Sequence, residues 1–242
     1  MKHFKLWNNV FGWLAFAIAA VTYLVTMEPT ASFWDCGEFI STAFKLDVGH
    51  PPGAPFFMLT GNFVSLFASD PTQIAYCVNM LSAFFSALTI LFLYFTITHL
   101  ARRMLVEKDQ EFALWKVITC LGSGFIGALA YTFSDTFWFS AVEGEVYAMS
   151  SLVTALVFWC MTKWYDQADT PYANRWIVLI SFLMGLSIGI HLLNLLAIPA
   201  LVFMFYYKQR EDGHYSAKEY LKIFAISVVI LAIILFGIIP YL

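Results

Sequence analysis

Side chains that could bind or transfer a proton gather in three polar stretches between long apolar segments. The first stretch reads EPTASFWDCGEFISTAFKLDVGHPPGAPFF and contains Asp35, Glu38 and, within a proline-rich corner, His50. Carboxylate and imidazole groups at a water-accessible site can act as a general base, bind a divalent cation or hold a polar headgroup. We expect a helix to begin near Phe33, which would place Asp35 and Glu38 on one helix face.

The second stretch, SDTFWFSAVEGEVYAMS, carries Asp135, Glu143 and Glu145, and the third, GIHLLNLLAIP, carries His191 and Asn194. Carboxylates at the entrance to a membrane helix are unfavourable near hydrocarbon unless they have partners or a function. Three separate loops therefore present groups suited to catalysis or to substrate binding.

These side chains also have purely structural interpretations. Acidic residues on the outer side of a membrane partly reflect the exclusion of Lys and Arg from that side, and they also stabilise helix N-termini. His50 could simply be a turn residue next to two prolines, and His191 could be a satisfied polar group inside the membrane. Glu145 could cap the helix that follows it.

The segments between these loops are typical of a membrane protein. Hydrophobic residues make up 61% of the 242 positions, charged residues only 12%, and the mean hydropathy is +0.75. A hydrocarbon core about 30 Å thick needs roughly 20 apolar residues per spanning helix. Five segments meet this requirement, at about residues 10–27, 76–100, 117–133, 146–164 and from 223 onwards. Residues 54–68 are apolar but short, which favours an interfacial helix.

The charge distribution decides how residues 176–207 cross the membrane. Read as a hairpin of two short helices, this segment leaves twelve of the thirteen Lys and Arg residues on one side and only Lys45 on the other. Because Lys and Arg near span ends favour the cytoplasm, the hairpin is preferred to a single span. The cytoplasmic residues would be Lys2, Lys5, Arg102, Arg103, Lys108, Lys116, Lys163, Arg175, Lys208, Arg210, Lys218 and Lys222.

The predicted fold is therefore all-α and polytopic, with seven membrane helices, two of them short, and two outer juxtamembrane helices. The N-terminus is expected in the cytoplasm, and the first span is expected to be uncleaved. The chain stops inside an apolar segment, FGIIPYL, so we expect residues 1–242 to be the N-terminal part of a longer chain. The sequence shows no zinc-binding spacing and no phosphate-binding loop, and its net charge of −3 does not indicate nucleic-acid binding.

The order of these elements resembles the GT-C superfamily of membrane glycosyltransferases, which use polyprenyl-phosphate-linked sugars. More narrowly, PTASFWDCGEFISTAFKLDVGHPPGAP and FWFSAVEGEVYAMSSL are similar to a large family of bacterial membrane proteins related to eukaryotic transmembrane protein O-mannosyltransferases. The resemblance covers essentially the whole chain. It implies a GT-C-like fold and an active site on the periplasmic side of the bacterial inner membrane.

The resemblance also implies roles for particular residues. The catalytic acidic position of the first loop corresponds to Asp35, with Glu38 as its neighbour, and the second-loop position to Glu143 or Glu145. His50 and Asn194 are further candidates for substrate binding. The donor would be a polyprenyl-phosphate-linked sugar, with mannose as one candidate, and the acceptor a hydroxyl of a protein or glycan.

The donor phosphate has no obvious partner in this sequence. Many relatives place a Lys near the hairpin tip, where this chain has IHLLN. Phosphate binding would then fall to His191, Lys45, a divalent cation or a part of the protein outside this sequence.

Two other functions fit a polytopic protein. A transporter or permease would also carry embedded carboxylates and short broken helices, although the acidic residues here concentrate in loops and no inverted repeat is visible. A non-catalytic scaffold subunit of an envelope complex is the third alternative.

Overall fold

A computed structural model describes residues 2–106, 113–210 and 216–241, and all the regular secondary structure within these ranges is helical. The α-helices are α1 (Lys2–Thr26), α2 (Cys36–Lys45), α3 (Pro55–Ser65), α4 (Ile74–Leu105), α5 (Leu114–Thr132), α6 (Asp135–Ala141), α7 (Val146–Gln167), α8 (Asn174–Ile188), α9 (Ile198–Gln209) and α10 (Ala217–Ala232). Short 3₁₀ segments, η1 (Pro71–Gln73) and η2 (Leu192–Ala197), precede α4 and α9. A π-helical turn, η3 (Ile233–Ile238), continues α10, and a last 3₁₀ turn, η4 (Ile239–Tyr241), follows it.

Six helical segments in the described part of the chain are long and apolar enough to cross a bilayer. They are Phe4–Thr26, Pro71–Leu105, Leu114–Thr132, Val146–Gln167, Leu192–Gln209 and Ala217–Ile238. These segments confirm a polytopic membrane protein, and five of them cover the spans expected from hydropathy. The remaining apolar helix, α8, has only 15 residues.

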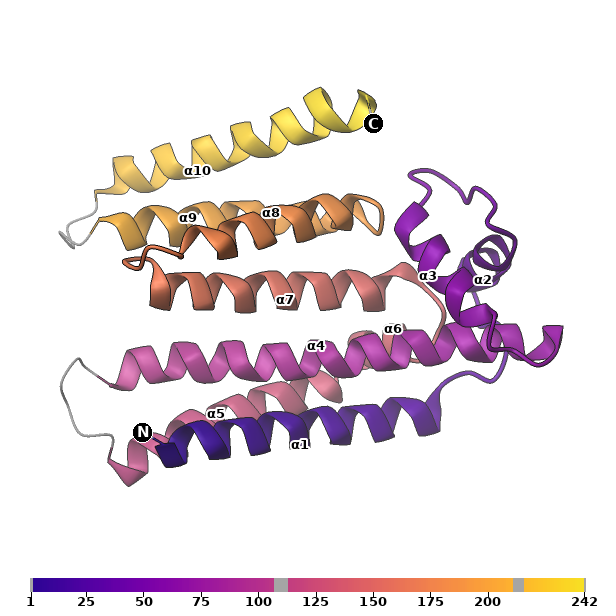
Figure 1. Cartoon of the computed structure of the whole chain (residues 1–242), viewed down its shortest axis with the longest axis horizontal. Coiled ribbons are helices and arrows are strands. Elements are labelled where there is room, and N and C mark those ends of the chain that lie inside the picture. Colours follow the sequence, from indigo (N-terminus) through magenta and orange to yellow (C-terminus); the bar gives the residue numbers. More distant parts are fainter. Residues whose placement is uncertain (1, 107–112, 211–215, 242) are drawn as a thin grey trace.

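The long helices lie side by side, with α4 in the middle (Figure 1). Helix α4 packs against α1 and α5 on one side and against α7 on the other, and α8 and α9 pack on α7. Alanines allow α1 and α4 to approach closely, because small side chains let helix backbones come together in a membrane. Four of these alanines are completely buried: Ala15, Ala19, Ala83 and Ala87.

The chain reverses between α8 and α9, so the two helices form a hairpin whose tip is residues 189–197 (Figure 1). This is the local geometry expected for residues 176–207. Helix α3 is tied to this tip, because the backbone N–H of Phe56 donates to the carbonyl of Gly189 at 2.7 Å.

The two ends of the bundle carry opposite charges. Helices α2 and α3, the hairpin tip and the start of α7 lie at one end, which we call the acidic end (Figure 1). The opposite end, which we call the basic end, holds the start of α1, the end of α4, the end of α7 and the starts of α8 and α10. The described residues Lys5, Arg102, Arg103, Lys116, Lys163, Arg175, Lys208, Arg210, Lys218 and Lys222 belong to the basic end. Lys108 lies outside the described residues.

Two local elements differ from the expectations. Helix α2 begins at Cys36, three residues later than expected, because Trp34 has a φ of +60°, a left-handed conformation that a right-handed helix cannot contain. The second acidic loop contains a short helix, α6, where a loop without helix was expected.

Candidate active site at the acidic end

The first and second acidic loops are joined through the start of α4. Asn79 is fully buried there, and its side-chain amide donates to the carbonyls of Glu28 at 2.7 Å and Thr30 at 2.9 Å. The backbone N–H of Glu28 in turn donates to the carbonyl of Val142 at 3.0 Å. Asn79 therefore holds the loop that leads to Asp35 on α4, and the hydrogen bond between Glu28 and Val142 places that loop beside the loop that leads to Glu145.

A tight turn, Glu143–Gly144–Glu145, delivers two carboxylates to the start of α7. The N–H of Glu145 donates to the carbonyl of Glu143 at 3.0 Å. A side chain at Gly144 would not fit, because a Cβ there would lie 2.9 Å from both Asn79 Oδ1 and Val78 Cγ1. Close packing on α4 thus requires glycine between the two glutamates.

Glu145 occupies the N-cap position of α7, but its side chain makes no capping hydrogen bond. It is 6% exposed, and burial raises its pKa to about 7. The negative charges of Glu143 and Asp35 contribute to this increase, and His50 opposes it. These effects show that three predicted site residues, Asp35, His50 and Glu143, lie close enough to Glu145 to influence its charge.

Glu143 is the most deeply buried carboxylate of the site, with 2% of its surface exposed. Burial raises its pKa, and a hydrogen bond with Ser32 partly offsets this effect. Its Oε2 atom has no hydrogen-bond partner among the described residues. A buried polar atom without a partner costs free energy unless a bound group satisfies it.

Asp35 and Glu38 have different surroundings. Asp35 is exposed at the N-cap of α2, on the side of Glu145. Glu38 accepts hydrogen bonds from the backbone N–H of His50 at 2.7 Å and contacts His50 Nδ1 at 3.2 Å. These contacts lower the pKa of Glu38 and hold the proline-rich corner against α2.

The remaining predicted residues are divided between the hairpin tip and the far end of α2. His191 begins η2, where its Nδ1 accepts from the N–H of Leu193 at 3.2 Å and its ring lies 5.3 Å from that of Tyr147. Burial lowers the pKa of His191 and so favours the neutral ring. Lys45 is exposed in the last turn of α2, more than two helical turns from Asp35.

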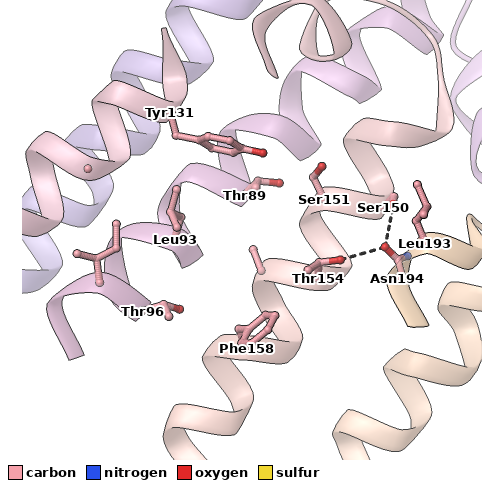
Figure 2. A pocket seen from close by; sticks show the side chains of 13 residues that line it. Thr89, Leu93, Thr96, Tyr131, Ser150, Ser151, Thr154, Phe158, Leu193 and Asn194 are labelled. Carbon is pink, nitrogen blue, oxygen red and sulfur yellow. Dashed lines mark hydrogen bonds between the residues drawn. The ribbon is translucent and has the colours of Figure 1, made fainter. Parts of the chain in front are cut away.

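Asn194 connects the hairpin tip to α7 and borders a cavity. Its Oδ1 accepts hydrogen bonds from the hydroxyls of Ser150 and Thr154, and it is 3% exposed. Its Nδ2 has no partner among the described residues. The cavity measures about 540 Å³ and lies between α4, α5, α7 and η2 (Figure 2). Its walls are mostly apolar, for example Leu93 and Phe158.

Sequence reasoning missed the residues that assemble the site. Asn79 holds the first acidic loop on α4, and Ser150 and Thr154 orient Asn194. A signal for Asn79 was present, because a carboxamide inside a predicted span is expensive unless it has partners. Among the residues that the structure describes, no group of three or more His, Cys, Asp or Glu side chains is arranged to hold a metal ion.

The sequence of this chain is similar to those of known membrane proteins. Two curated relatives are named protein O-mannosyl-transferases. The chain is 25% identical over 211 residues to the protein from Dictyostelium discoideum, which covers 82% of this chain and 24% of the relative. It is 27% identical over 175 residues to the protein from Mus musculus, which covers 72% of this chain and 22% of the relative. This chain therefore spans about a quarter of the length of these relatives.

No solved structure matches the chain significantly. The family model described as the protein O-mannosyl-transferase TMEM260 N-terminal domain matches residues 35–214. This match starts at Asp35 and includes the rest of the first acidic loop, the whole second acidic loop and the hairpin tip, which carry the candidate site residues. The chain belongs to the TMEM260 N-terminal domain family of protein O-mannosyl-transferases.

Proposed function

We propose that this chain forms the donor-binding and catalytic part of a membrane glycosyltransferase that moves a sugar, with mannose as the leading candidate, from a polyprenyl-phosphate donor to a hydroxyl of a protein or glycan. The observation that carries the proposal is the position of the exposed Asp35 beside the buried Glu145, next to one end of a largely apolar cavity. A water-soluble acceptor and a lipid-linked donor would meet at this point.

The cavity supports the choice of a lipid-linked donor. Ser150 and Ser151 line it and follow Glu145 by five and six residues on the same helix, a rise of roughly 8 Å. A lipid chain lying against Leu93 and Phe158 would therefore place its phosphate near the carboxylates. The hydroxyls of the cavity and the free Nδ2 of Asn194 are suited to hydrogen bonding near that phosphate.

In the proposed reaction, the Asp35 carboxylate takes the proton from the acceptor hydroxyl. The acceptor oxygen then attacks the anomeric carbon, and the bond between that carbon and the phosphate oxygen breaks with inversion. Asp35 is assigned this role because it is exposed to an acceptor arriving from water, and a general base must reach the proton that it removes. The polyprenyl phosphate leaves with the electron pair of the broken bond.

Glu145 and Glu143 are assigned to binding the acceptor. A carboxyl group with a pKa of about 7 is partly protonated at neutral pH, so it can either donate to or accept from a sugar or protein hydroxyl. Glu38 is a positioning residue that holds His50 towards the carboxylates. The leaving phosphate is assigned to His191 or to a divalent cation, whereas Lys45 lies too far along α2 to serve without movement.

The same proposal sets the orientation. Charge bias favours the basic end in the cytoplasm, so the acidic end would face the periplasm of a bacterial inner membrane. The hairpin of α8 and α9 would then be embedded as two short helices, giving seven membrane helices. Helices α2 and α3 would lie on the outer surface, as in GT-C enzymes.

The test is sugar transfer by the purified protein in lipid nanodiscs, with a polyprenyl-phosphate sugar carrying a radiolabelled mannose and a serine- and threonine-rich acceptor peptide. We expect labelled peptide and free polyprenyl phosphate in equal amounts. A matched reaction with a nucleotide-linked mannose should give no product. Uptake of solutes into proteoliposomes without sugar transfer would overturn the proposal in favour of a transporter.

A further inference from the structure

A polar cavity of about 460 Å³ opens at the basic end, between α1, α4 and α7. It lies at the opposite end of the bundle from the proposed active site and plays no part in the proposed sugar transfer. Three cationic residues line it, one from each helix: Lys5, Arg102 and Lys163. Among the residues described, Asp166 is the one carboxylate in its wall.

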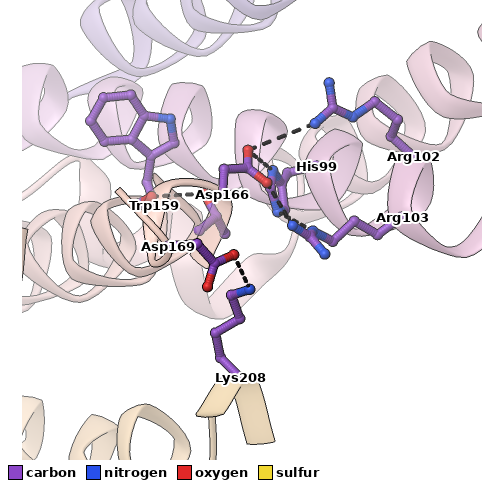
Figure 3. A network of polar contacts seen from close by, with 8 residues as sticks. His99, Arg102, Arg103, Trp159, Asp166, Asp169 and Lys208 are labelled. Carbon is purple, nitrogen blue, oxygen red and sulfur yellow. Dashed lines mark hydrogen bonds and ion pairs between the residues drawn. The ribbon is translucent and has the colours of Figure 1, made fainter. Parts of the chain in front are cut away.

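The charge of Asp166 is already neutralised. Its Oδ1 accepts from Arg103 at 2.7 Å, and its Oδ2 lies 3.5 Å from His99 Nδ1 and 3.7 Å from Arg102 (Figure 3). Arg103 is fixed in place because its guanidinium stacks 4.1 Å from the centre of the Tyr165 ring and its Nε donates to His99 Nε2. Asp166 is therefore held by Arg103 and does not repel an anion as a free carboxylate would.

The two lysines of the cavity form no direct ion pair with a carboxylate in the described part of the chain. Neither Lys5 nor Lys163 has an ion pair within the described ranges, and the Lys163 ammonium lies 5.0 Å above the ring of Trp159. Arg102 and Lys5 both lie close enough to Lys163 to repel its charge, and Asp166, which is already paired with Arg103, opposes this repulsion. Like charges gathered in a partly enclosed space are unfavourable unless an anion joins them.

The cavity also contains groups that bind hydroxyls. The carboxamides of Asn8, Asn9 and Gln167 line it, and Asn8 Oδ1 is buried with no partner in the described part of the chain. An acceptor of this kind requires a donor such as a hydroxyl. The cavity therefore fits a ligand that carries a phosphate and hydroxyls together.

We propose that this cavity binds the phosphoglycerol headgroup of an anionic phospholipid. The phosphate would lie between Lys5, Arg102 and Lys163, and the glycerol hydroxyls would face the asparagines of α1. The position supports a lipid as the source of the phosphate, because the cavity lies at the ends of membrane-spanning helices, where headgroups are located. Basic pockets between membrane helices are suited to such headgroups.

The experiment is native mass spectrometry of the intact protein in a neutral detergent, titrated with phosphatidylglycerol or with phosphatidylcholine of the same acyl chains. The wild type should bind one phosphatidylglycerol with clear preference. A basic residue near an anionic headgroup contributes roughly fivefold to affinity. The double variant Lys5→Gln, Lys163→Met should therefore lose about 25-fold.

The control is Lys218→Gln, Lys222→Gln, which removes the same charge from exposed positions on α10 at the same end. It should bind phosphatidylglycerol like the wild type, and Lys163→Arg should retain most of the affinity. A thermal melt without added lipid checks that each variant is folded. Equal losses in both double variants, or no preference for phosphatidylglycerol, would overturn the proposal. Binding of inorganic phosphate or glycerol 1-phosphate that phosphatidylglycerol cannot displace would overturn the lipid assignment.

Discussion

The carboxylates at the acidic end and at the basic end of this bundle have different surroundings. At the acidic end, Glu143 and Glu145 are buried, and burial raises the pKa of each carboxyl. At the basic end, Asp166 and Asp169 are paired with cations, Asp169 with Lys208 at 2.8 Å. Unpaired buried carboxylates cost free energy and persist where they have a function, whereas paired charges near a surface mainly anchor a helix end. The comparison therefore points to the acidic end as the site of chemistry.

The largest expected effect is all-or-none and concerns orientation. In a cysteine-free background, cysteines at Lys45 and in the loop of residues 135–145 should react with a membrane-impermeant reagent from outside. Cysteines at Arg102 and Lys218 should react only after the membrane is opened. Outside labelling at Lys218→Cys would contradict the hairpin of α8 and α9 and would reverse the assignment of the two ends.

The next effect is catalytic. Asp35→Asn should lower sugar transfer about 10²–10⁴-fold, because the amide keeps the size of the side chain and removes the base. Its melting temperature should hardly change, since Asp35 is exposed and makes no side-chain capping hydrogen bond. The matched control is Asp135→Asn, an exposed carboxylate at the start of α6, which should transfer sugar normally. Normal turnover by Asp35→Asn would remove this residue from the mechanism.

The third effect is a pH dependence of stability at Glu145. Because burial raises its pKa from 4.5 to about 7, the folded state binds the proton more tightly than the unfolded state does. The protonated Glu145 therefore contributes to the free energy of unfolding, by about 3 kcal/mol at most. This contribution is fully present below about pH 4.5 and is lost as the pH rises through 7.

Glu145→Gln imitates the protonated group, so the variant should melt at a higher temperature than the wild type at pH 8 and at a similar temperature at pH 4.5. A series of thermal melts between these values measures the difference. A variant that is less stable at every pH would instead identify Glu145 as a structural cap of α7.

A smaller effect tests how closely the second loop packs on α4. Gly144→Ala should destabilise the protein by about 1–3 kcal/mol, because the added methyl group meets Asn79 and Val78 at 2.9 Å. It should also reduce transfer by displacing Glu145. Gly122→Ala in α5 is the control, since a Cβ there meets nothing within 4 Å. Equal thermal melts for the two variants would contradict the described packing.

The smallest effect is expected at the basic end. Asp166→Asn breaks partly exposed ion pairs with Arg102 and Arg103, which are worth about 1 kcal/mol or less. Sugar transfer should remain near the wild-type rate. A loss as large as that of Asp35→Asn would show that the two ends do not differ in function as proposed.

The sequence alone determined the membrane class and most of the spans. In a bilayer the backbone polar groups of a long apolar segment are satisfied when the segment is a helix, so hydropathy located α1, α4, α5, α7 and α10. The predicted ends differ from the observed ones by up to about eight residues, at the start of α1. The sequence also indicated which helix ends lie on the same side, because Lys and Arg residues lie alternately at the end of one predicted span and at the start of the next. The acidic loops and the hairpin tip were identified as site candidates for the same reason, since a polar residue beside hydrocarbon is conspicuous.

Tertiary structure decided which candidates come together. Hydropathy could not show that Asn79 holds the first acidic loop on α4, that Asp35 lies near Glu145, or that Glu38 contacts His50. These contacts link residues far apart in the chain or depend on a turn. Hydropathy also placed the start of α2 too early, because a left-handed conformation at Trp34, whose side chain is 87% exposed, is uncommon for a bulky residue and has no signal in residue type. Local composition determined what each segment is, and burial and long-range hydrogen bonds determined what each side chain can do.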